Sequence, residues 1–286
     1  MDLNINNITF IIVCFKSDKI IRSCLNSLPL NSKKIIIENS NNIDLKKDLE
    51  IEYDNIKVIL NKNTGMGASN NLGIKMSNTE YAFILNPDVT FQKNTFENLT
   101  NSSKKIDDFA ILSPLNDKDK YPNYKIKKNY INNNKDKILV DVIDGFSMLI
   151  NKKKFKNDEF FDENFFLYLE NDDLCMRTKQ INENIYIMKN SLINHLGGSS
   201  ADKKFLIEIE YLRNWHWMWS KFYFNKKHYG FFKAVMSVTR NLFSAQFKYI
   251  YYLITFNAFK KNIYKMRFLG LVNAMLGKKS WYRINI

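Results

Sequence analysis

The feature that most constrains the fold is a series of short apolar segments separated by segments with helical spacing. Residues 8–15 are almost entirely apolar, which is typical of a strand buried on both faces of a parallel sheet. Similar segments lie at 34–38, 56–60, 81–85 and 110–113, and helical spacing occurs at 17–28, 67–76 and 95–103. This alternation predicts an α/β fold of the doubly wound kind, with a mostly parallel central sheet flanked by helices.

The second half of the chain continues this pattern less regularly and then becomes helical. We expect a polar surface loop at 116–137, strands at 138–143, 146–150, 185–188 and 192–195, and a helix from Glu170 to about Gln180. From residue 199 the spacing is helical almost to the end of the chain. No internal repeat interrupts this order.

The net charge of +14 comes entirely from the C-terminal part of the chain. Residues 1–210 carry 29 Lys and Arg against 29 Asp and Glu, whereas residues 211–286 carry 14 Lys and Arg and no acidic residue. The same stretch holds all four Trp and 21 of the 41 aromatic residues. The sequence therefore predicts two regions, an α/β domain at 1–205 and a basic, aromatic-rich helical extension at 206–286.

The composition of this extension predicts a membrane surface as its partner. Tyr, Trp, Lys and Arg together are typical of a membrane interface. Lys233, Arg240 and Lys248 interrupt its most apolar part, 229–259, so no spanning helix is expected. Nucleic acid is the rival partner, but no RNP-like, zinc-finger or helix-turn-helix signature occurs, and we expect none. In the plainest alternative these helices cap the first domain and their lysines are simply solvated.

The cysteines and the first residues indicate the compartment. Cys14, Cys24 and Cys175 are far apart and form no CxxC pair, which fits a reducing compartment. No basic region precedes the apolar segment at 8–15, so no signal peptide is expected. We therefore expect a cytoplasmic protein, peripheral on the inner face of the cytoplasmic membrane.

Candidate ligand sites follow the predicted strands, because open α/β sheets bind ligands at the carboxyl ends of their strands. Glu38-Asn39-Ser40 follows the second strand, and its acid can accept hydrogen bonds from a ribose or a base. Asn86-Pro87-Asp88 follows the strand at 81–85, and its carboxylate can hold Mg²⁺ or Mn²⁺ that bridges a diphosphate. Both segments are also ordinary turn sequences.

The loop at 63–71 follows a strand and opens a helix. It reads Asn63-Thr64-Gly65-Met66-Gly67-Ala68-Ser69-Asn70-Asn71. Glycines there let the backbone approach a phosphate, and helix N-termini favour anions. Asn70 occupies the third glycine position of the dinucleotide fingerprint and no Gly-Lys-Ser/Thr follows, so neither that motif nor a Walker loop is present.

Two later segments supply further candidates. The start of the helix predicted from residue 170 contains three carboxylates, Glu170, Asp172 and Asp173, and follows a strongly apolar segment. The helix dipole favours carboxylates there, and carboxylates beside an apolar segment are candidates for a general base. His195 lies at a strand end before Gly197, where it can complete a metal site or have a structural role. Because there is no HExxH and no Cys/His cluster, a zinc site is not expected.

The order and spacing of these segments resemble glycosyltransferase family 2, which has the GT-A fold, and within it the rhamnosyltransferase-like branch that builds cell-surface polysaccharides. The resemblance covers about residues 8–200. The matching motifs are Glu38-Asn39-Ser40, Asn63-Thr64-Gly65 with Asn70, Asn86-Pro87-Asp88, Phe161-Asp162-Glu163 with Phe165-Phe166, the helix start Glu170-Asn171-Asp172-Asp173-Leu174-Cys175-Met176-Arg177, and His195 with Gly198-Ser199.

The resemblance implies an inverting, metal-dependent transferase that uses Mg²⁺ or Mn²⁺. It would move a sugar from a nucleoside-diphosphate sugar to a saccharide or lipid-linked saccharide acceptor, in O-antigen, capsule or similar glycan synthesis. Asp88 would bind the metal, and His195 would be a second metal or diphosphate contact. The donor site would include Phe15, Glu38, Asn39, Ser40, Asn63, Gly65, Asn70, Asn86, Asp88 and Gly145.

Two departures from the family pattern affect this reading. The family has Asp where this chain has Glu38, and the longer acid can still reach a nucleoside. The family's catalytic Asp falls on Asn171, whose amide cannot take a proton. Glu170 or Asp172, in the cluster with Asp173, would then serve as base, or the chain would be a catalytically impaired nucleotide-sugar-binding protein. A nucleotidyltransferase would need a glycine-rich loop after the first strand, which is missing.

Overall fold

The computed structural model describes residues 3–106, 108–116, 122–126, 134–156, 159–197 and 205–284. The chain forms two compact units. The first, here the sheet unit, comprises Met1–Asp162 and Asn171–Asp202, and the second, here the helical unit, comprises Glu163–Glu170 and Lys203–Ile286. Most of the expected loop at 116–137, together with Gly198 and Ser199, lies outside the described residues. The two regions expected from sequence, 1–205 and 206–286, differ from these units at residues 163–170 and 203–205, which belong to the helical unit.

Four parallel strands form one half of the main sheet. They are β1 (Ile8–Cys14), β2 (Lys33–Glu38), β3 (Ile56–Leu60) and β4 (Tyr81–Leu85), in the order β3-β2-β1-β4. All three neighbouring pairs are parallel, as expected from sequence. β1 is buried along its whole length, which explains why its residues show no polar alternation.

The other half of the sheet mixes strand directions. Its strands are β10 (Ser147–Asn151), β6 (Ile111–Asn116), β11 (Ile185–His195), β5 (Val89–Phe91) and β8 (Lys137–Leu139), and a separate ribbon pairs β7 (Tyr124–Lys125) with β9 (Val142–Ile143). β10 runs antiparallel to both β4 and β6, and β5 and β8 run antiparallel to β11. Two expected strands, 185–188 and 192–195, are one strand with a register shift. The expected strand at 138–143 is divided between β8 and β9.

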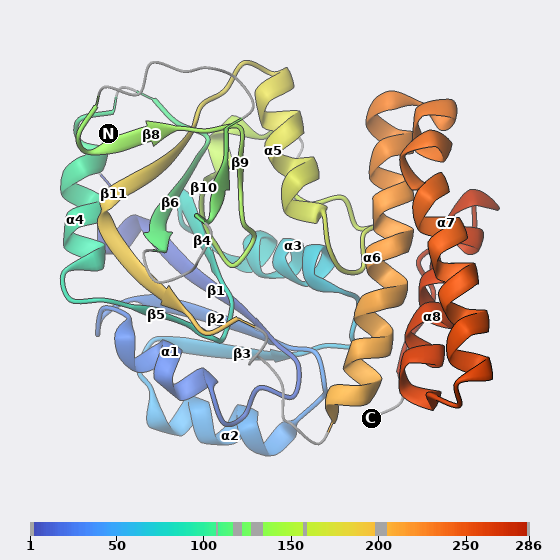
Figure 1. Cartoon of the computed structure of the whole chain (residues 1–286). Helices are drawn as coiled ribbons and strands as arrows, with labels where there is room; N and C mark the ends of the chain where they lie inside the picture. The colour runs from blue at the N-terminus through green and yellow to red at the C-terminus, as the bar shows by residue number, and fades with distance from the viewer. Residues whose placement is uncertain are drawn as a thin grey trace. The chain divides into compact units, whose positions relative to one another are not determined.

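Helices cover both faces of this sheet (Figure 1). They are α1 (Ile21–Ser27), α2 (Ile43–Glu52), α3 (Met66–Met76), α4 (Thr95–Ser103) and α5 (Glu170–Gln180), with short 3₁₀ turns at Ile5–Asn7 and Lys152–Lys154. The sequence does not predict α2, because most of its residues are charged and only two, Leu45 and Leu49, are buried apolar residues. Its start is fixed by Asn42, whose side chain accepts a hydrogen bond from the Leu45 amide at 3.0 Å.

Alternate residues of β1 serve two separate cores. Phe10 and Ile12 pack in a cluster with residues of α1, α2 and α4, whereas Ile11 packs with residues of α3 and α5. α3 approaches β1 very closely at Gly73. A Cβ placed on Gly73 would lie 2.4 Å from Cγ2 of Ile11, which is far below van der Waals contact. This glycine therefore sets the distance between α3 and the sheet.

The helical unit consists of three long helices: α6 (Leu206–Tyr229), α7 (Phe231–Ile254) and α8 (Ala258–Met275). Trp215, Phe222, Ala234 and Leu271 belong to their shared core. α6 and α8 pack closely where Gly270 faces Trp215, since a Cβ on Gly270 would lie 2.3 Å from the Trp215 carbonyl oxygen. Among the helices that the structure describes, none is apolar enough over a sufficient length to cross a membrane.

The contact at Gly73 leads to a stability prediction. Gly73→Ala should lower the free energy of unfolding by about 1–3 kcal/mol, because the added methyl group overpacks the α3–β1 contact. Urea denaturation of the wild type, Gly73→Ala, Ile11→Ala and the double variant measures the effect. The double variant should be less destabilised than the two single losses combined, because Ile11→Ala removes the clashing atom. Strict additivity would contradict the close contact.

Candidate functional site

The strand register brings the predicted motifs to one edge of the sheet. Cys14 of β1 pairs with Glu38 of β2, which in turn pairs with Leu60 of β3. Leu85, the last residue of β4, pairs with Ile12 of β1. The segments that follow these four strands therefore leave the sheet at its carboxyl edge, where open α/β sheets bind ligands.

The Glu38 carboxylate closes the turn that follows β2. It is fully buried and accepts hydrogen bonds from the Ser40 amide at 3.1 Å, the Ser40 hydroxyl at 2.5 Å and the Asn42 amide at 2.6 Å. Asn42 is also the N-cap of α2. The backbone that follows β1, at Phe15 and Lys16, also lies close to this turn, because the Lys16 amide donates a hydrogen bond to Ser40 Oγ at 3.5 Å. Glu38 thus holds the turn and the start of α2 together.

A polar network joins the ends of β2 and β3 to the start of α3. Asn39 donates from Nδ2 to Ser69 Oγ at 2.8 Å and accepts on Oδ1 from Asn61 Nδ2 at 2.9 Å. Ser69 and Thr64 place their hydroxyl oxygens 3.3 Å apart. Sequence reasoning did not single out Asn61, although it follows β3 as Asn39 follows β2. This network fixes the loop before α3 to the carboxyl edge of the sheet.

The loop before α3 has the backbone that its glycine predicts. Gly65 has φ +99°, a conformation that favours glycine, and its amide bonds to Asn63 Oδ1 at 3.3 Å. One turn into α3, Asn70 is nearly buried, and its Oδ1 has no hydrogen-bond partner among the described residues. Asn71 instead holds the Phe161 backbone through bonds of 2.8 and 2.9 Å.

Asp88 and His195 lie next to each other after β4 and at the end of β11. Pairing of β5 with β11 places His195 opposite Val89, and the Leu196 amide donates to the Asp88 carbonyl at 3.1 Å. His195 Nε2 lies 3.5 Å from Asp88 Oδ1, and the imidazole stacks on Phe146 with 3.9 Å between ring centroids. The Asp88 side chain is only 2% exposed. A carboxylate and an imidazole therefore face each other in a buried position.

This pair fits a hard divalent cation. Asp88 Oδ1 and Asn86 Oδ1 are buried, and neither has a hydrogen-bond partner among the described residues. Unpartnered buried oxygens are costly unless a ligand satisfies them. No group of three or more His, Cys, Asp or Glu side chains suited to a metal occurs in the described part of the chain. Mg²⁺ is commonly bound by one or two protein groups and completed by substrate phosphates, which matches this arrangement.

The start of α5 contains three carboxylates, Glu170, Asp172 and Asp173, and the amide Asn171. Asn171 donates from Nδ2 to the Ile143 carbonyl at 2.8 Å. Asp173 is fully buried and accepts from Arg177 Nε at 2.9 Å, whereas Asp172 lies 3.4 Å from the Lys125 ammonium. Asp173 thus has a firm structural partner, and Asp172 is in a looser ion pair.

Gly145 lies against this helix start. A Cβ on Gly145 would lie 3.1 Å from Cβ of Asn171 and 3.4 Å from its Cγ. Together with the bond to Ile143, this contact fixes the Asn171 amide between the chain at 143–145 and the backbone of α5. Gly145 therefore has a packing reason for lacking a side chain.

All three cysteines are free and buried, which argues against a role as nucleophiles at this edge. Burial raises the pKa of Cys24 and of Cys175 to about 12, and burial together with Glu38 raises that of Cys14 well above its usual value. Because the thiolate is the reactive form, these thiols are unreactive near neutral pH.

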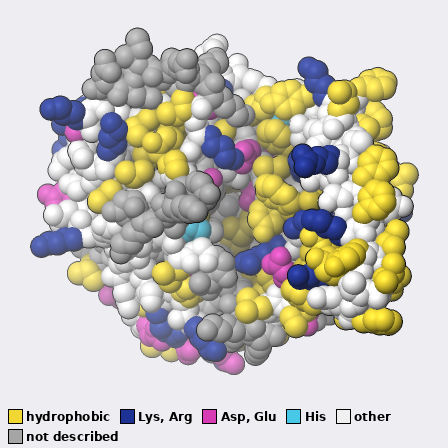
Figure 2. Space-filling view, in the orientation of Figure 1, with side chains coloured by type: hydrophobic (Ala, Val, Ile, Leu, Met, Phe, Trp, Pro, Cys, Tyr) yellow, Lys and Arg dark blue, Asp and Glu magenta, His cyan; other side chains and the backbone are white. Residues whose placement is uncertain are grey.

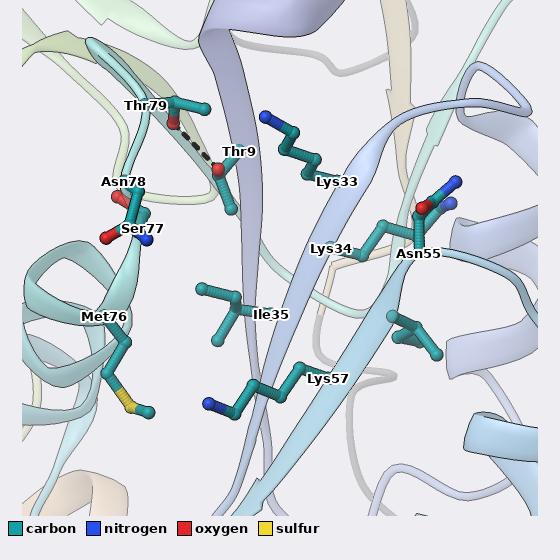
Figure 3. A pocket seen from close by; sticks show the side chains of 11 residues that line it. Thr9, Lys33, Lys34, Ile35, Asn55, Lys57, Met76, Ser77, Asn78 and Thr79 are labelled. Carbon is teal, nitrogen blue, oxygen red and sulfur yellow. Dashed lines mark hydrogen bonds between the residues drawn. The ribbon is translucent and has the colours of Figure 1, made fainter.

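A pocket of about 290 Å³ lies at the opposite, amino-terminal edge of the strands (Figure 3). Its lining includes Thr9, Lys33, Lys57 and Thr79, and the two threonine hydroxyl oxygens lie 2.7 Å apart. None of the predicted site residues lines it. The carboxyl edge, with its buried and unpartnered oxygens, is therefore the better candidate site.

The bond from Asn171 to a carbonyl leads to a prediction. Asn171→Asp should lower the free energy of unfolding by about 1–3 kcal/mol at pH 7, because an ionised carboxylate cannot donate to the Ile143 carbonyl. A protonated carboxyl can donate, so the loss should shrink as the pH falls below about 4. Urea denaturation at both pH values measures it. Asn171→Ala is the control, and its loss should not depend on pH.

Comparison with known proteins agrees with this geometry. The sequence profile of Glycosyl transferase family 2 matches residues 9–185, more than half of the chain. The low-salt glycan biosynthesis hexosyltransferase Agl10 of Haloferax volcanii is 26% identical over an alignment of 200 residues, and the match covers 63% of this chain and 64% of that protein. The chain thus spans just under two thirds of the length of this relative.

Two solved structures share the fold at low sequence identity. The mannosyltransferase PcManGT of Pyrobaculum calidifontis, in complex with GDP-Man and Mn²⁺, has a TM-score of 0.55 at 12% identity, covering 96% of this chain and 88% of that one. TarS residues 1–349 of S. aureus, in complex with UDP, has a TM-score of 0.52 at 13% identity, covering 98% and 94%. The fold is GT-A, and the chain belongs to glycosyltransferase family 2.

Proposed function

We propose that this protein is an inverting, metal-dependent glycosyltransferase that uses a nucleoside-diphosphate sugar. The observation that carries the proposal is the buried Asp88 carboxylate, whose Oδ1 accepts no hydrogen bond from the described residues and lies 3.5 Å from His195 Nε2 at the carboxyl edge of the sheet. The neighbours solved with GDP-Man and Mn²⁺ and with UDP support this donor class. The acceptor would be a saccharide or lipid-linked saccharide in cell-surface polysaccharide synthesis. The glycan-biosynthesis relative supports that pathway class, and the sequence motifs favour the rhamnosyltransferase-like branch.

The donor nucleoside would bind against the turn after β2 and the loop before α3. Ser40 and Asn63 offer polar groups there, and Gly65 lets the backbone approach the ligand. Phe15, Asn39, Asn70 and Asn86 complete the proposed donor site, with Gly145 beside the sugar. The four hydrogen bonds that the Glu38 carboxyl oxygens accept favour an indirect role, in which Glu38 shapes the turn rather than contacting the nucleoside.

Asp88 and His195 would hold Mg²⁺ or Mn²⁺. When bound, such an ion neutralises the charge that develops on the leaving diphosphate. Asp88 is suited to this because its carboxylate is nearly removed from water and held by the turn at 86–89, so a bound cation would meet a fixed, weakly solvated charge. Asn86 contributes a second buried oxygen beside it.

A carboxylate at the start of α5 would take the proton from the acceptor hydroxyl. The acceptor oxygen then bonds to the anomeric carbon as the bond to the diphosphate breaks, in one displacement with inversion. Of the carboxylates expected from sequence, Asp173 is tied to Arg177, and Asn171 is an amide. Glu170 and Asp172 remain, and we propose Glu170 as the base. If neither acts as a base, the chain is a nucleotide-sugar-binding protein with impaired catalysis.

Thermal stabilisation by nucleotides tests the donor site. UDP, GDP or dTDP at about 100 times its Kd should stabilise the protein by about 2.7 kcal/mol, which raises Tm by roughly 5 °C, when Mn²⁺ is present. Asp88→Asn should abolish this shift without lowering the Tm of the free protein. Asp54→Asn removes an exposed carboxylate of the same unit and should leave the shift intact. A full, metal-dependent shift in Asp88→Asn would contradict the proposed metal site.

We also propose that the helical unit lies on an anionic membrane surface at the cytoplasmic face. α7 carries an exposed apolar stripe at helical spacing, which includes Phe232 at 84%, Met236 at 78%, Phe247 at 71% and Ile254 at 68% exposure. Lys233, Arg240 and Lys248 are exposed on the same helix. Figure 2 shows hydrophobic side chains with Lys and Arg among them over this part of the molecule. Each basic residue near an anionic leaflet contributes about 1 kcal/mol.

Vesicle sedimentation tests the membrane proposal. The protein should bind vesicles that contain anionic lipid, and binding should weaken at high salt because the attraction is partly electrostatic. Met236→Ser with Phe247→Ser should weaken binding about tenfold or more, since two apolar side chains no longer enter the interface. Ile51→Ser, at an 84% exposed residue of α2, is the matched control and should bind normally. Equal binding by both variants would contradict the proposal.

A further inference from the structure

Residues 163–170 belong to the helical unit, although the sheet unit precedes and follows them in the sequence. We call this segment the strap. It ends at Glu170, the first residue of α5 and the proposed base. The contacts of the strap with α6 therefore bear directly on the backbone from which the Glu170 side chain projects.

The aromatic residues of the strap pack on one face of α6. Phe165 is fully buried and meets Tyr223 edge to face, with 4.9 Å between ring centroids. Phe166 is 3% exposed, and its ring centroid lies 4.5 Å from that of the His216 imidazole. His216, Ser220 and Tyr223 are spaced by four and three residues, so they share a face of the helix. The strap thus has a continuous contact surface along α6.

The second half of the strap makes two more contacts with the same helix. Ser220 donates from Oγ to the Leu167 carbonyl at 2.8 Å. The Tyr168 ring meets Trp217 edge to face at 5.4 Å, and burial raises the pKa of the Tyr168 hydroxyl to about 12. These two contacts fix the backbone and the side chain immediately before Leu169 and Glu170.

The backbone there is held in an unfavourable conformation. Tyr168 has φ +71° and Leu169 has φ +66°, so two consecutive residues with a Cβ are in the left-handed region. Such a conformation is unfavourable for a residue with a Cβ and persists only where its surroundings hold it. The bond from Ser220 and the packing of Tyr168 on Trp217 lie at and beside these two residues, and they hold this conformation in place. Without them, the chain before Glu170 would relax to another conformation.

The α6 face is itself fixed by the C-terminal segment. His216 Nε2 lies 2.8 Å from the Tyr282 carbonyl oxygen, and Nδ1 lies 2.9 Å from Ser280 Oγ. Since a carbonyl cannot donate, Nε2 carries the proton and Nδ1 accepts from Ser280. Burial lowers the pKa of His216 to about 3, so the ring is neutral at physiological pH. The Arg283 guanidinium lies 3.6 Å from the Phe166 ring centroid and contacts the strap as well.

We propose that the helical unit positions the base through the strap, with Ser220 and Trp217 as positioning residues. The role of Glu170 as base rests on the proposed function, whereas the fixing of its backbone does not. A base must lie within hydrogen-bond reach of the proton that it takes. A displacement of about 1 Å can lower a rate roughly 100-fold. The helical unit would then contribute to the chemical step as well as to membrane binding.

Hydrogen–deuterium exchange of the full chain tests the positioning. Ser220→Ala, Trp217→Leu and the double variant should raise exchange at residues 165–173, by about tenfold or more in the double variant, and leave the strands of the sheet unit unchanged. Asn225→Ala is the matched control, because it removes a 2.7 Å bond to the Lys221 carbonyl within α6, and it should change nothing in the strap. Unchanged exchange at 165–173 in the double variant would overturn the proposal.

Turnover separates positioning from a purely structural role. In hydrolysis of the nucleotide sugar whose nucleoside diphosphate stabilises the wild type, with water as the acceptor, the double variant should lose about tenfold or more in kcat, while the KM for the nucleotide sugar and the nucleotide-induced Tm shift stay within twofold of wild type. An unchanged kcat despite faster exchange, or a loss confined to KM, would also overturn it. A wild type that binds no nucleotide would contradict the proposed function, whereas the exchange result would still decide the positioning of the strap.

Discussion

The parallel register of β1 to β4 is the constraint on which the candidate site depends. Because Cys14, Glu38 and Leu60 lie at one level across three strands, the residues that follow them emerge side by side. Pairing of β4 with β1 adds the turn at 86–89 to the same edge. A shift of one strand by one residue would turn each buried side chain to the other face and move its following turn along the sheet. The two cores that β1 serves, through Phe10 and Ile11, hold this register from both faces.

Polar side chains at this edge fall into two groups with different physical roles. Glu38, Asn39 and Asn71 have hydrogen-bond partners within the protein and hold loops in place. Asp88 and Asn86 instead keep buried oxygens that have no hydrogen-bond partner in the described part of the chain. The first group makes the edge rigid, and the second leaves it in need of a cation or a ligand. Such a division between supporting and unsatisfied groups is expected of a preorganised binding site.

Much of the sheet unit could be predicted from sequence, because β1, β3 and β4 are short apolar strands that periodicity identifies. The direction of β10 could not, since an apolar strand buried between two neighbours has the same pattern in either orientation. α2 lacks a wide apolar face, and β5 has only three residues, so neither gives a clear period. Asn39, Asn63 and Asp88 follow strands that the sequence predicts, but the sequence could not indicate that the Glu38 oxygens are already bonded.

The strap was beyond sequence reasoning for a different reason. Phe165 and Phe166 indicate burial, but no local pattern indicates that they pack on a helix about fifty residues later in the chain. Likewise, tertiary contacts impose the positive φ of Tyr168 and Leu169. Neither residue type favours this conformation, so the sequence could not predict it.

The helical unit has two faces with separate proposed tasks, which makes them separable by substitution. The face of α6 that holds His216, Ser220 and Tyr223 is directed to the strap, whereas Phe232, Met236 and Phe247 of α7 are exposed. Residues of α6 and α7 meet in the shared core through Trp215, Phe222 and Ala234, so each outer face rests on the same packed interior. Substitutions on the exposed stripe of α7 should therefore leave the strap contacts intact, and substitutions at Ser220 should leave the stripe intact. A substitution that weakens both membrane binding and the strap contacts would then act through the shared core of the unit.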